Sequence, residues 1–297
     1  MRIVFLFLSL LCIFSVARAE RPLVVASIFP LAEIAEEIGG DEIETKLLLP
    51  PGADPHSWEP TPKDILALKR ARLLLAIGGG LEPWLEDILS GLRVGNLKIL
   101  LFLSPPKHSH SHKIHHACHP ENPHVWLDFL EDARFCLRVA ETLAEIFPEK
   151  ASHFRHRGKS LAEKFEALHE RFDRTLKTCR HRIVPLAGHD AFSAWERNYG
   201  LDFVTLAGAS PEAEPTPETL RKLIVLMRQE GLRAVFYDEP QSLRFAKIIA
   251  RETGAKIYYL SPGANLTKEE YRRGLGFFDL MLRNLKNLSL GLECGCN

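Results

Sequence analysis

Short apolar runs alternate with longer amphipathic stretches in the first half of the chain. The apolar runs are rich in Val, Ile and Leu, which is typical of buried strands. They cover residues 23–28, 44–49, 73–77 and 98–103. Helical spacing follows at 31–38 and 65–70, the second preceded by the helix start Thr61-Pro62. Strands that alternate with helices predict a parallel sheet wrapped by helices.

The second half of the chain repeats this alternation. Its apolar runs cover residues 182–187, 203–206, 233–237 and 256–260. Helices are expected to begin near Phe192, Pro217, Gln241 and Lys268. The last of these helices is preceded by the capping box Thr267-Lys268-Glu269-Glu270. The chain is therefore predicted to be an α/β protein of two lobes, each with its own parallel sheet.

The stretch 148–180 between the halves predicts one long helix. It contains one glycine, Gly158, and no proline beyond Pro148. Its apolar residues recur at helical spacing and form one stripe: Phe154, Leu161, Phe165, Leu168, Phe172 and Leu176. At about 1.5 Å per residue, roughly 30 helical residues would extend ~45 Å. We expect this helix to join the two lobes as a rigid connection.

The N-terminus has the features of a secretory signal. Arg2 precedes the apolar run 3–16, which is shorter than the ~20 residues of a spanning helix. Ala17-Arg18-Ala19 fits the small-x-small cleavage rule, so the mature chain is predicted to begin at Glu20 in the periplasm. Lipidation at Cys12 is disfavoured because Leu11 stands where a small residue is expected.

The expected organisation follows from these segments. It consists of a signal peptide 1–19, an N-terminal lobe 20–147, a linking helix 148–180, a C-terminal lobe 181–290 and a tail 291–297. Export permits disulfides. The mature chain has an odd number of cysteines, so at least one thiol is unpaired: Cys118, Cys136, Cys179, Cys294 and Cys296. A bond between Cys136 and Cys179 is one candidate. The tail Cys294-Gly295-Cys296 is expected to be a frayed end, with metal chelation as the alternative.

Composition and charge exclude some classes of partner. The chain of 297 residues is 46% hydrophobic, and 38 Lys and Arg balance 38 Asp and Glu. A neutral chain offers no overall attraction to nucleic acid, which is therefore not expected as a partner. Histidine stands out, because six of the 13 lie between His108 and His119. We expect this segment, within a loop at 104–121, to bind zinc weakly; a polar loop without a specific role is the alternative.

Three single histidines follow predicted strands, which is where open α/β sheets bind ligands. His56 follows the run 44–49, His124 follows 98–103 after a long loop, and His189 follows 182–187. They come from both halves, so we expect them to meet in a cleft between the lobes. Neutral imidazoles suit zinc, whereas calcium and magnesium prefer oxygen. Taken singly, each histidine is better explained as a core or surface residue than as a ligand, and it is their joint placement after three strands that favours a ligand role.

Four motifs resemble a known family. They are 51–60 (Pro-Gly-Ala-Asp-Pro-His-Ser-Trp-Glu-Pro), 122–128 (Asn-Pro-His-Val-Trp-Leu-Asp), 188–192 (Gly-His-Asp-Ala-Phe) and 208–215 (Gly-Ala-Ser-Pro-Glu-Ala-Glu-Pro). With them, essentially the whole mature chain resembles the solute-binding proteins of zinc and manganese ABC transporters, of the ZnuA and TroA type. The resemblance implies two α/β lobes joined by one long helix, metal held between them and delivery to a membrane permease.

The same resemblance implies metal ligands at His56, His124 and His189. Manganese-binding relatives commonly have glutamate at the third position, so His189 favours zinc. The family's fourth ligand is usually aspartate in Leu-Asp-Pro after the last strand, but this chain has Ser261 there. A water molecule or Glu239 remains open as the fourth ligand. Asp128 and Asp190 are candidates to orient a ligand imidazole, with capping or surface roles as the alternative.

Together these features predict an extracytoplasmic, monomeric protein that captures Zn²⁺ and delivers it to an ABC-type importer, without being an enzyme. Transport of manganese or iron within the same family is the nearest alternative. A three-histidine zinc hydrolase with Glu239 as base is another, although no His-Glu-x-x-His motif is present. A metal-binding surface adhesin is a third, but the sequence has no separate adhesive module.

Overall fold

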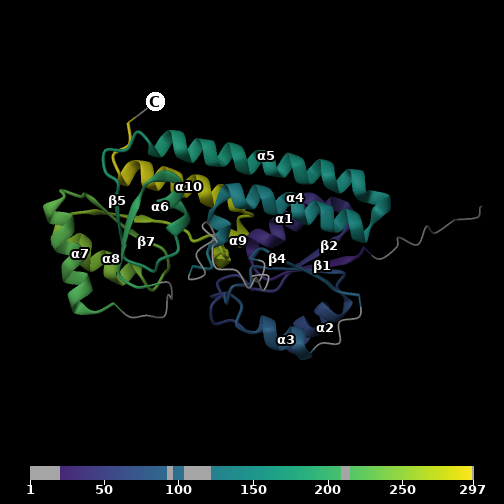
Figure 1. Cartoon of the computed structure of the whole chain (residues 1–297). Coiled ribbons are helices and arrows are strands. Elements are labelled where there is room, and N and C mark those ends of the chain that lie inside the picture. The colour runs from purple at the N-terminus through teal and green to yellow at the C-terminus, as the bar shows by residue number, and fades with distance from the viewer. Residues whose placement is uncertain (1–20, 92–95, 104–121, 209–214, 296–297) are drawn as a thin grey trace, which may run out of the picture.

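The computed structural model describes residues 21–91, 96–103, 122–208 and 215–295 (Figure 1). The predicted signal peptide, the histidine-rich loop 104–121 and two cysteines, Cys118 and Cys296, lie outside these residues. Within the described ranges, no helix is both long and apolar enough to cross a membrane.

Two parallel four-stranded sheets form the framework. The first has the order β2-β1-β3-β4, from Leu23–Ala26 (β1), Glu44–Leu47 (β2), Leu73–Ala76 (β3) and Lys98–Leu101 (β4). The second has the order β6-β5-β7-β8, from Ile183–Leu186 (β5), Asp202–Thr205 (β6), Ala234–Tyr237 (β7) and Lys256–Tyr259 (β8). The predicted fold class is confirmed, and each strand lies within one residue of its predicted run. We call each sheet with its helices the N-terminal or C-terminal lobe.

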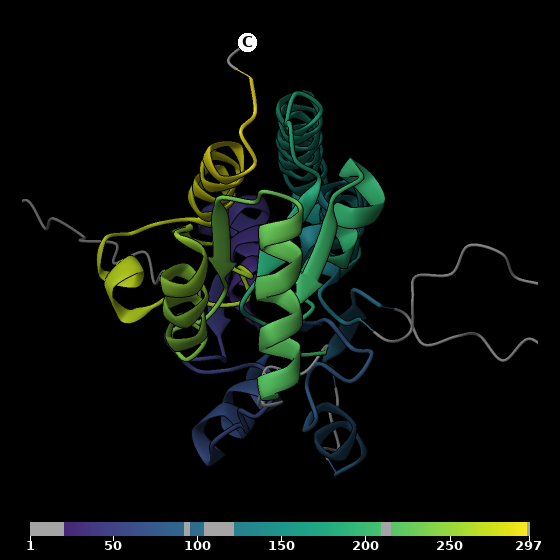
Figure 2. The ribbon, with the colours of Figure 1, turned by 90° about the vertical axis from the view of Figure 1, so that its left-hand side faces the viewer.

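The helices cover these sheets and connect them (Figures 1 and 2). Those before the second sheet are Phe29–Gly39 (α1), Pro62–Arg70 (α2), Leu85–Gly91 (α3), Phe129–Ile146 (α4) and Ala151–Leu176 (α5). The remainder are Ser193–Tyr199 (α6), Pro217–Gln229 (α7), Leu243–Thr253 (α8), Lys268–Arg272 (α9) and Phe277–Gly291 (α10). The sequence predicts a helix from Lys268 onward, but the structure has two helices there, α9 and α10. They are separated at Gly274, whose φ of +63° favours glycine.

The linking helix is α5, which runs past both lobes (Figure 1). It is shorter than the predicted stretch because a 3₁₀ turn, Pro148–Lys150, precedes it. All six residues of the predicted apolar stripe are buried. Helix α5 packs along α4, and α4 is a helix that the sequence pattern did not predict. A Cβ atom at Gly158 would lie 2.4 Å from the Cβ of Ala140, so glycine permits this close approach.

The lobes share one hydrophobic core and are joined by hydrogen bonds. A continuous cluster of buried residues includes members of α1, α4, α5, α6 and α10. The Trp126 indole donates to the carbonyl of Pro262 (2.8 Å), and the Trp195 indole donates to the carbonyl of Leu127 (3.0 Å). These contacts join segments that follow different sheets, so they fix one lobe against the other.

The cysteine pairing differs from the candidate drawn from sequence. Cys179, just beyond α5, is bonded to Cys294, just beyond α10. The proposed Cys136–Cys179 bond is wrong. Cys136 is a free buried thiol on α4 beside Gly158, roughly 30 Å along α5 from Cys179 at 1.5 Å per residue. The expectation of a frayed tail at Cys294 is also wrong, because the disulfide holds this segment.

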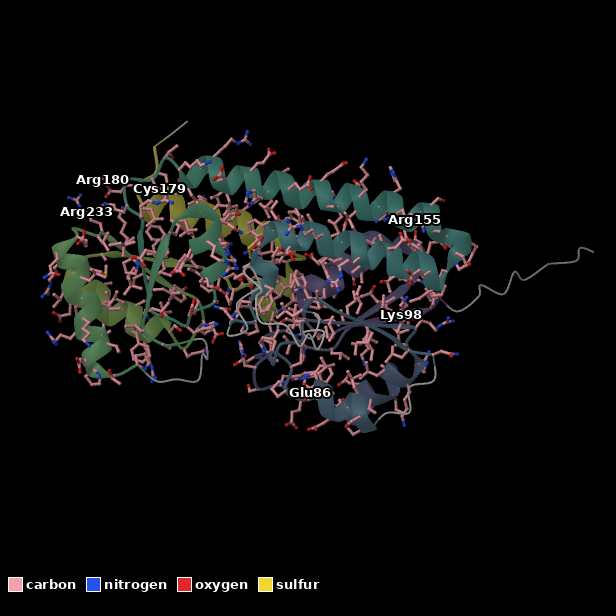
Figure 3. All side chains as sticks on the ribbon, in the orientation of Figure 1. Glu86, Lys98, Arg155, Cys179, Arg180 and Arg233 are labelled. Carbon is pink, nitrogen blue, oxygen red and sulfur yellow. A yellow bond between two sulfur atoms is a disulfide. The ribbon has the colours of Figure 1, made fainter. Side chains whose placement is uncertain are left out.

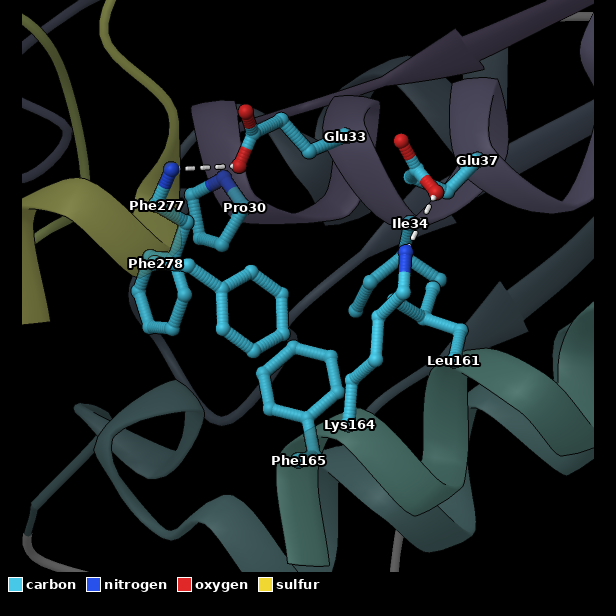
Figure 4. Close-up of a pocket in the computed structure, with 9 residues that line it drawn as sticks. All are labelled: Pro30, Glu33, Ile34, Glu37, Leu161, Lys164, Phe165, Phe277 and Phe278. Atoms are coloured by element: carbon cyan, nitrogen blue, oxygen red, sulfur yellow. Dashed lines mark hydrogen bonds and ion pairs between the residues drawn. The ribbon is translucent and has the colours of Figure 1, made fainter. Parts of the chain in front are cut away.

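A cavity of about 80 Å³ lies where α1, α5 and α10 meet (Figure 4). Phe165 and Phe277 are among its apolar walls. The Glu33 carboxylate on α1 accepts a hydrogen bond from the backbone N–H of Phe277 (2.6 Å). Burial, reinforced by the nearby carboxylates of Glu36 and Glu37 and opposed by the Phe277 hydrogen bond, raises the pKa of Glu33 to about 7.

This carboxyl group should make the stability of the protein depend on pH. Its folded pKa is raised above the ordinary 4.5, so the folded state holds a proton that the unfolded state releases. Its contribution is fully present below about pH 4.5 and is lost as pH rises through about 7. Glu33→Gln keeps an acceptor for Phe277 without the charge. At pH 8 it should therefore raise the free energy of unfolding by on the order of 2 kcal/mol relative to wild type.

Urea unfolding of both proteins at pH 5 and pH 8 measures this difference. The advantage of the Glu33→Gln variant should shrink markedly at pH 5, where the wild-type carboxyl is already protonated. An advantage that is equal at the two pH values would contradict the assignment.

Candidate metal centre

Each of the three histidines lies beyond the C-terminal end of a strand. His56 follows β2, His124 follows β4, and His189 follows β5. His124 and His189 are 4% and 3% exposed, and His56 is partly buried. The parallel order of each sheet directs these ends to the same edge, and the two edges face each other between the lobes. The structure thus brings together residues that lie up to 133 positions apart in the chain (56 to 189).

The three imidazoles present their Nε2 atoms to one another. The distance between the Nε2 atoms of His56 and His124 is 3.2 Å, and that between His124 and His189 is 3.1 Å. One ligand atom from each ring lies within 4.8 Å of the others. Tetrahedral zinc with Zn–N bonds of ~2.05 Å separates its nitrogen ligands by about 3.3 Å. The separations of His124 from His56 and from His189 therefore match the ligand spacing of tetrahedral zinc.

Asn122 determines which nitrogen of His124 carries a proton. Its side-chain oxygen lies 2.7 Å from Nδ1 of His124 and accepts from the backbone N–H of the same residue (3.1 Å). Because an amide oxygen can only accept, Nδ1 must carry the hydrogen. The Nε2 lone pair of His124 is then free and faces the other two rings.

Asp238 has the same effect on His189. Its carboxylate, directly after β7, lies 2.7 Å from Nδ1 of His189 and accepts from the His189 backbone N–H (2.9 Å). The Ser242 hydroxyl donates to the other carboxylate oxygen (2.9 Å). A Cβ atom at Gly188 would come within 2.2 Å of this carboxylate, so only glycine permits the approach. This ion-pair contact favours hydrogen on Nδ1 of the neutral His189 ring, whose Nε2 then faces the cluster with its lone pair.

These tautomers leave two bare nitrogen atoms 3.1 Å apart. No hydrogen bond can form between Nε2 of His124 and Nε2 of His189 while both rings are neutral and carry hydrogen on Nδ1, so the space between the two atoms then suits a proton or a metal cation. Lone pairs at this distance repel each other unless a cation lies between them. The arrangement is therefore suited to a positive ion, and the donor set of three imidazoles suits a borderline metal such as zinc.

The pKa values of the two buried rings shift in opposite directions. Burial, helped by the neighbouring His189 and His56, lowers the pKa of His124 well below its ordinary value. Burial also acts to lower the pKa of His189, but the contact with Asp238 outweighs it and raises that pKa. His124 is thus held neutral, as a metal ligand must be.

The loop that carries His56 is fastened to the C-terminal lobe. The Asn265 amide donates to the carbonyls of Pro50 and Ala53, both at 2.8 Å. Within the loop, the Asp54 carboxylate accepts from the backbone N–H of His56 (2.9 Å). These contacts hold the least buried of the three rings in place.

The protein offers no carboxylate as a fourth member of the cluster within the described residues. Ser261 is buried in a turn, where its hydroxyl accepts from the backbone N–H of Gly263 (3.2 Å). Glu239 is close enough to interact electrostatically with His189 but lies outside the cluster. Burial and the neighbouring Asp238 raise the pKa of Glu239 to about 7. A solvent molecule or a movement of Glu239 therefore remains open as the fourth ligand.

Sequence reasoning missed both residues that orient the rings. Asp128, one candidate for this role, instead caps α4 by accepting from the backbone N–H groups of Leu130 and Glu131. The residues that contact the imidazoles are Asn122 and Asp238. Asn122 stands two positions before a predicted ligand, and Asp238 directly follows a predicted strand. In the sequence, these two positions were the signs that Asn122 and Asp238 could orient a ligand ring.

Comparisons with known proteins show which family the chain is similar to. Residues 24–291 match the family model described as zinc-uptake complex component A, periplasmic. The chain is 27% identical over 285 residues to the zinc-binding protein AdcA of Streptococcus pyogenes, covering 90% of this chain and 55% of AdcA. It is 28% identical over 281 residues to the high-affinity zinc uptake system protein ZnuA of Bacillus subtilis, covering 92% of this chain and 88% of ZnuA.

A solved structure shows the same fold. The metal-dependent lipoprotein YcdH from Bacillus subtilis superimposes with a TM-score of 0.79 and 27% identity, covering 92% of this chain and 99% of that one. The chain spans about half the length of the AdcA proteins that it matches (55%).

Proposed function

The chain belongs to the family of periplasmic zinc-uptake components, and we propose from this membership and from its site that it captures zinc outside the cytoplasm. His56, His124 and His189 hold the ion between the lobes. The protein, as a monomer, then delivers zinc to an ABC-type importer in the membrane. Zinc is the cargo of this protein rather than a resident cofactor.

One observation carries the proposal. Nε2 atoms from both lobes face one another at 3.1 and 3.2 Å, and the partners of His124 and His189 leave their lone pairs exposed to each other. A bound cation removes the repulsion that this arrangement creates. Relatives named for zinc binding and zinc uptake support zinc as that cation.

The site also explains how the two lobes cooperate in binding. His56 and His124 come from the N-terminal lobe and His189 from the C-terminal lobe, so the ion is bound fully only when the lobes are together. The shared core and the indole bonds of Trp126 and Trp195 already hold the lobes against each other. Release to a permease therefore requires local rearrangement at the ligand loops.

The donor set favours zinc over manganese. Manganese prefers oxygen ligands, and no carboxylate joins the three rings within the described part of the chain.

Competition between metals tests the proposal. The chain from Glu20 onward, freed of metal, is titrated at pH 7.5 with zinc, manganese and ferrous iron against a chromophoric chelator. Zinc should bind at least 100-fold more tightly than manganese, in keeping with the order of stability of imidazole complexes. A preference for manganese, or hydrolysis of an activated ester faster than by free zinc, would contradict the proposed function.

A further inference from the structure

Asn122 makes more contacts with the site than orientation of one ring requires. We propose that it is a positioning residue: it presents the Nε2 lone pair of His124 to zinc and at the same time fixes His124 against the segment of His189 in the other lobe. This inference rests on the proposed function and extends it to a residue that does not touch the ion.

The backbone around Asn122 fixes the orientation of its side-chain amide. Its Nδ2 lies 2.8 Å from the carbonyl oxygen of Asp190, and its Oδ1 lies 3.1 Å from the backbone nitrogen of His124. A peptide carbonyl can only accept and a peptide N–H can only donate. Flipping the amide would break both bonds, so the surrounding backbone fixes its orientation.

The fixed amide in turn determines which nitrogen of His124 carries the proton. With the amide orientation fixed, its oxygen faces Nδ1 of His124 at 2.7 Å and requires a hydrogen there. The Nε2 lone pair of His124 is consequently available before any metal arrives. Without Asn122, the neutral ring is free to place its hydrogen on Nε2, where it would block coordination.

His124 lies between the other two rings of the cluster. Its Nε2 lies 3.2 Å from that of His56 and 3.1 Å from that of His189, so it is the central ligand. The bond from Asn122 to Asp190 reaches the residue next to His189. One amide therefore sets the relative position of two ligands that come from different lobes, and its loss should disturb both.

Two variants and a matched control test this role. Asn122→Ala removes the acceptor and the bond between the lobes. Asn122→Asp keeps an acceptor for Nδ1 and loses the donor. Asn287→Ala is the control, because Asn287 on α10 also donates from its amide to a partly buried backbone carbonyl, that of Tyr259 (2.7 Å), but contacts no imidazole.

Zinc affinity and the tautomer of His124 are the two measurements. Asn122→Ala should weaken zinc binding roughly 10- to 100-fold, the usual effect of losing a partner of a metal-binding histidine. Asn122→Asp should recover at least part of that loss, and Asn287→Ala should stay within about twofold of wild type. The ¹⁵N shifts of His124 in the zinc-free protein should show hydrogen on Nδ1 in wild type and in Asn122→Asp, and a mixture in Asn122→Ala.

The results separate this inference from the proposed function. A wild-type protein that does not bind zinc would overturn the proposed function itself. If wild type binds zinc but Asn122→Ala binds as tightly as Asn287→Ala, only the role of Asn122 is overturned. Asn122→Asp binding no better than Asn122→Ala would also overturn it, since the acceptor would then have no effect.

Discussion

Replacing His124 with alanine should weaken zinc binding by roughly 300- to 1,000-fold. The His124 ring is buried, and its Nε2 lies within 3.2 Å of that of each of the other rings, so its loss removes the centre of the ligand set. If three imidazoles share a binding free energy of about 10 kcal/mol, each supplies roughly 3–4 kcal/mol. No other single substitution in the site is expected to have a larger effect.

Chelator competition with purified His124→Ala and wild type measures the loss. His156→Ala is the matched control, because it removes an exposed imidazole from α5, away from the cluster. The control should bind zinc as wild type does. Affinity of His124→Ala within tenfold of wild type would mean that zinc is held elsewhere, and the assignment of all three ligands would then fail.

Much of the framework was accessible from sequence for a simple reason. The central strands β1, β3, β5 and β7 are largely buried, as parallel strands covered on both faces are, and they appear as short apolar runs. The edge strand β2 is Glu-Thr-Lys-Leu, and its run was recognised from the leucines that end it. Each predicted run overlaps a strand. The same regularity located the three histidines, because ligand groups in such folds follow strand ends. The stripe from Phe154 to Leu176 likewise identified the linking helix.

The partners of the rings were not accessible in this way. Asp238 reaches His189 because β7 lies beside β5 in the sheet, although β6 lies between them in the chain. Strand order depends on packing of the whole lobe, which a linear pattern does not contain. Asn122 orients His124 locally, but its second bond, to Asp190, joins the two lobes. Which lobe surfaces meet is likewise decided only by the fold.

The disulfide is a further feature that could not be predicted from the linear sequence pattern. Its removal is the second change from which we expect a large effect, here on the free energy of unfolding. Cys179 and Cys294 are 115 residues apart, and their bond closes a loop that contains β5–β8 and α6–α10 (Figure 3). Closing a loop of about 100 residues lowers the conformational entropy of the unfolded chain, which is equivalent to up to ~4.7 kcal/mol of stability at 25 °C. Measured gains in stability from a disulfide are typically about 2–4 kcal/mol. Replacing both cysteines with serine should lower the free energy of unfolding by about 2–5 kcal/mol.

Urea unfolding of the double serine variant, with and without reductant, measures this effect. Reductant should destabilise wild type to the level of the variant, because it opens the Cys179–Cys294 bond that the variant lacks. The loop encloses only the C-terminal lobe, but the buried cluster contains residues from both lobes. The loss should therefore shift the unfolding of both lobes together. A separate early transition of the C-terminal lobe, or an unchanged midpoint, would contradict this account of how α5 and α10 hold the molecule together.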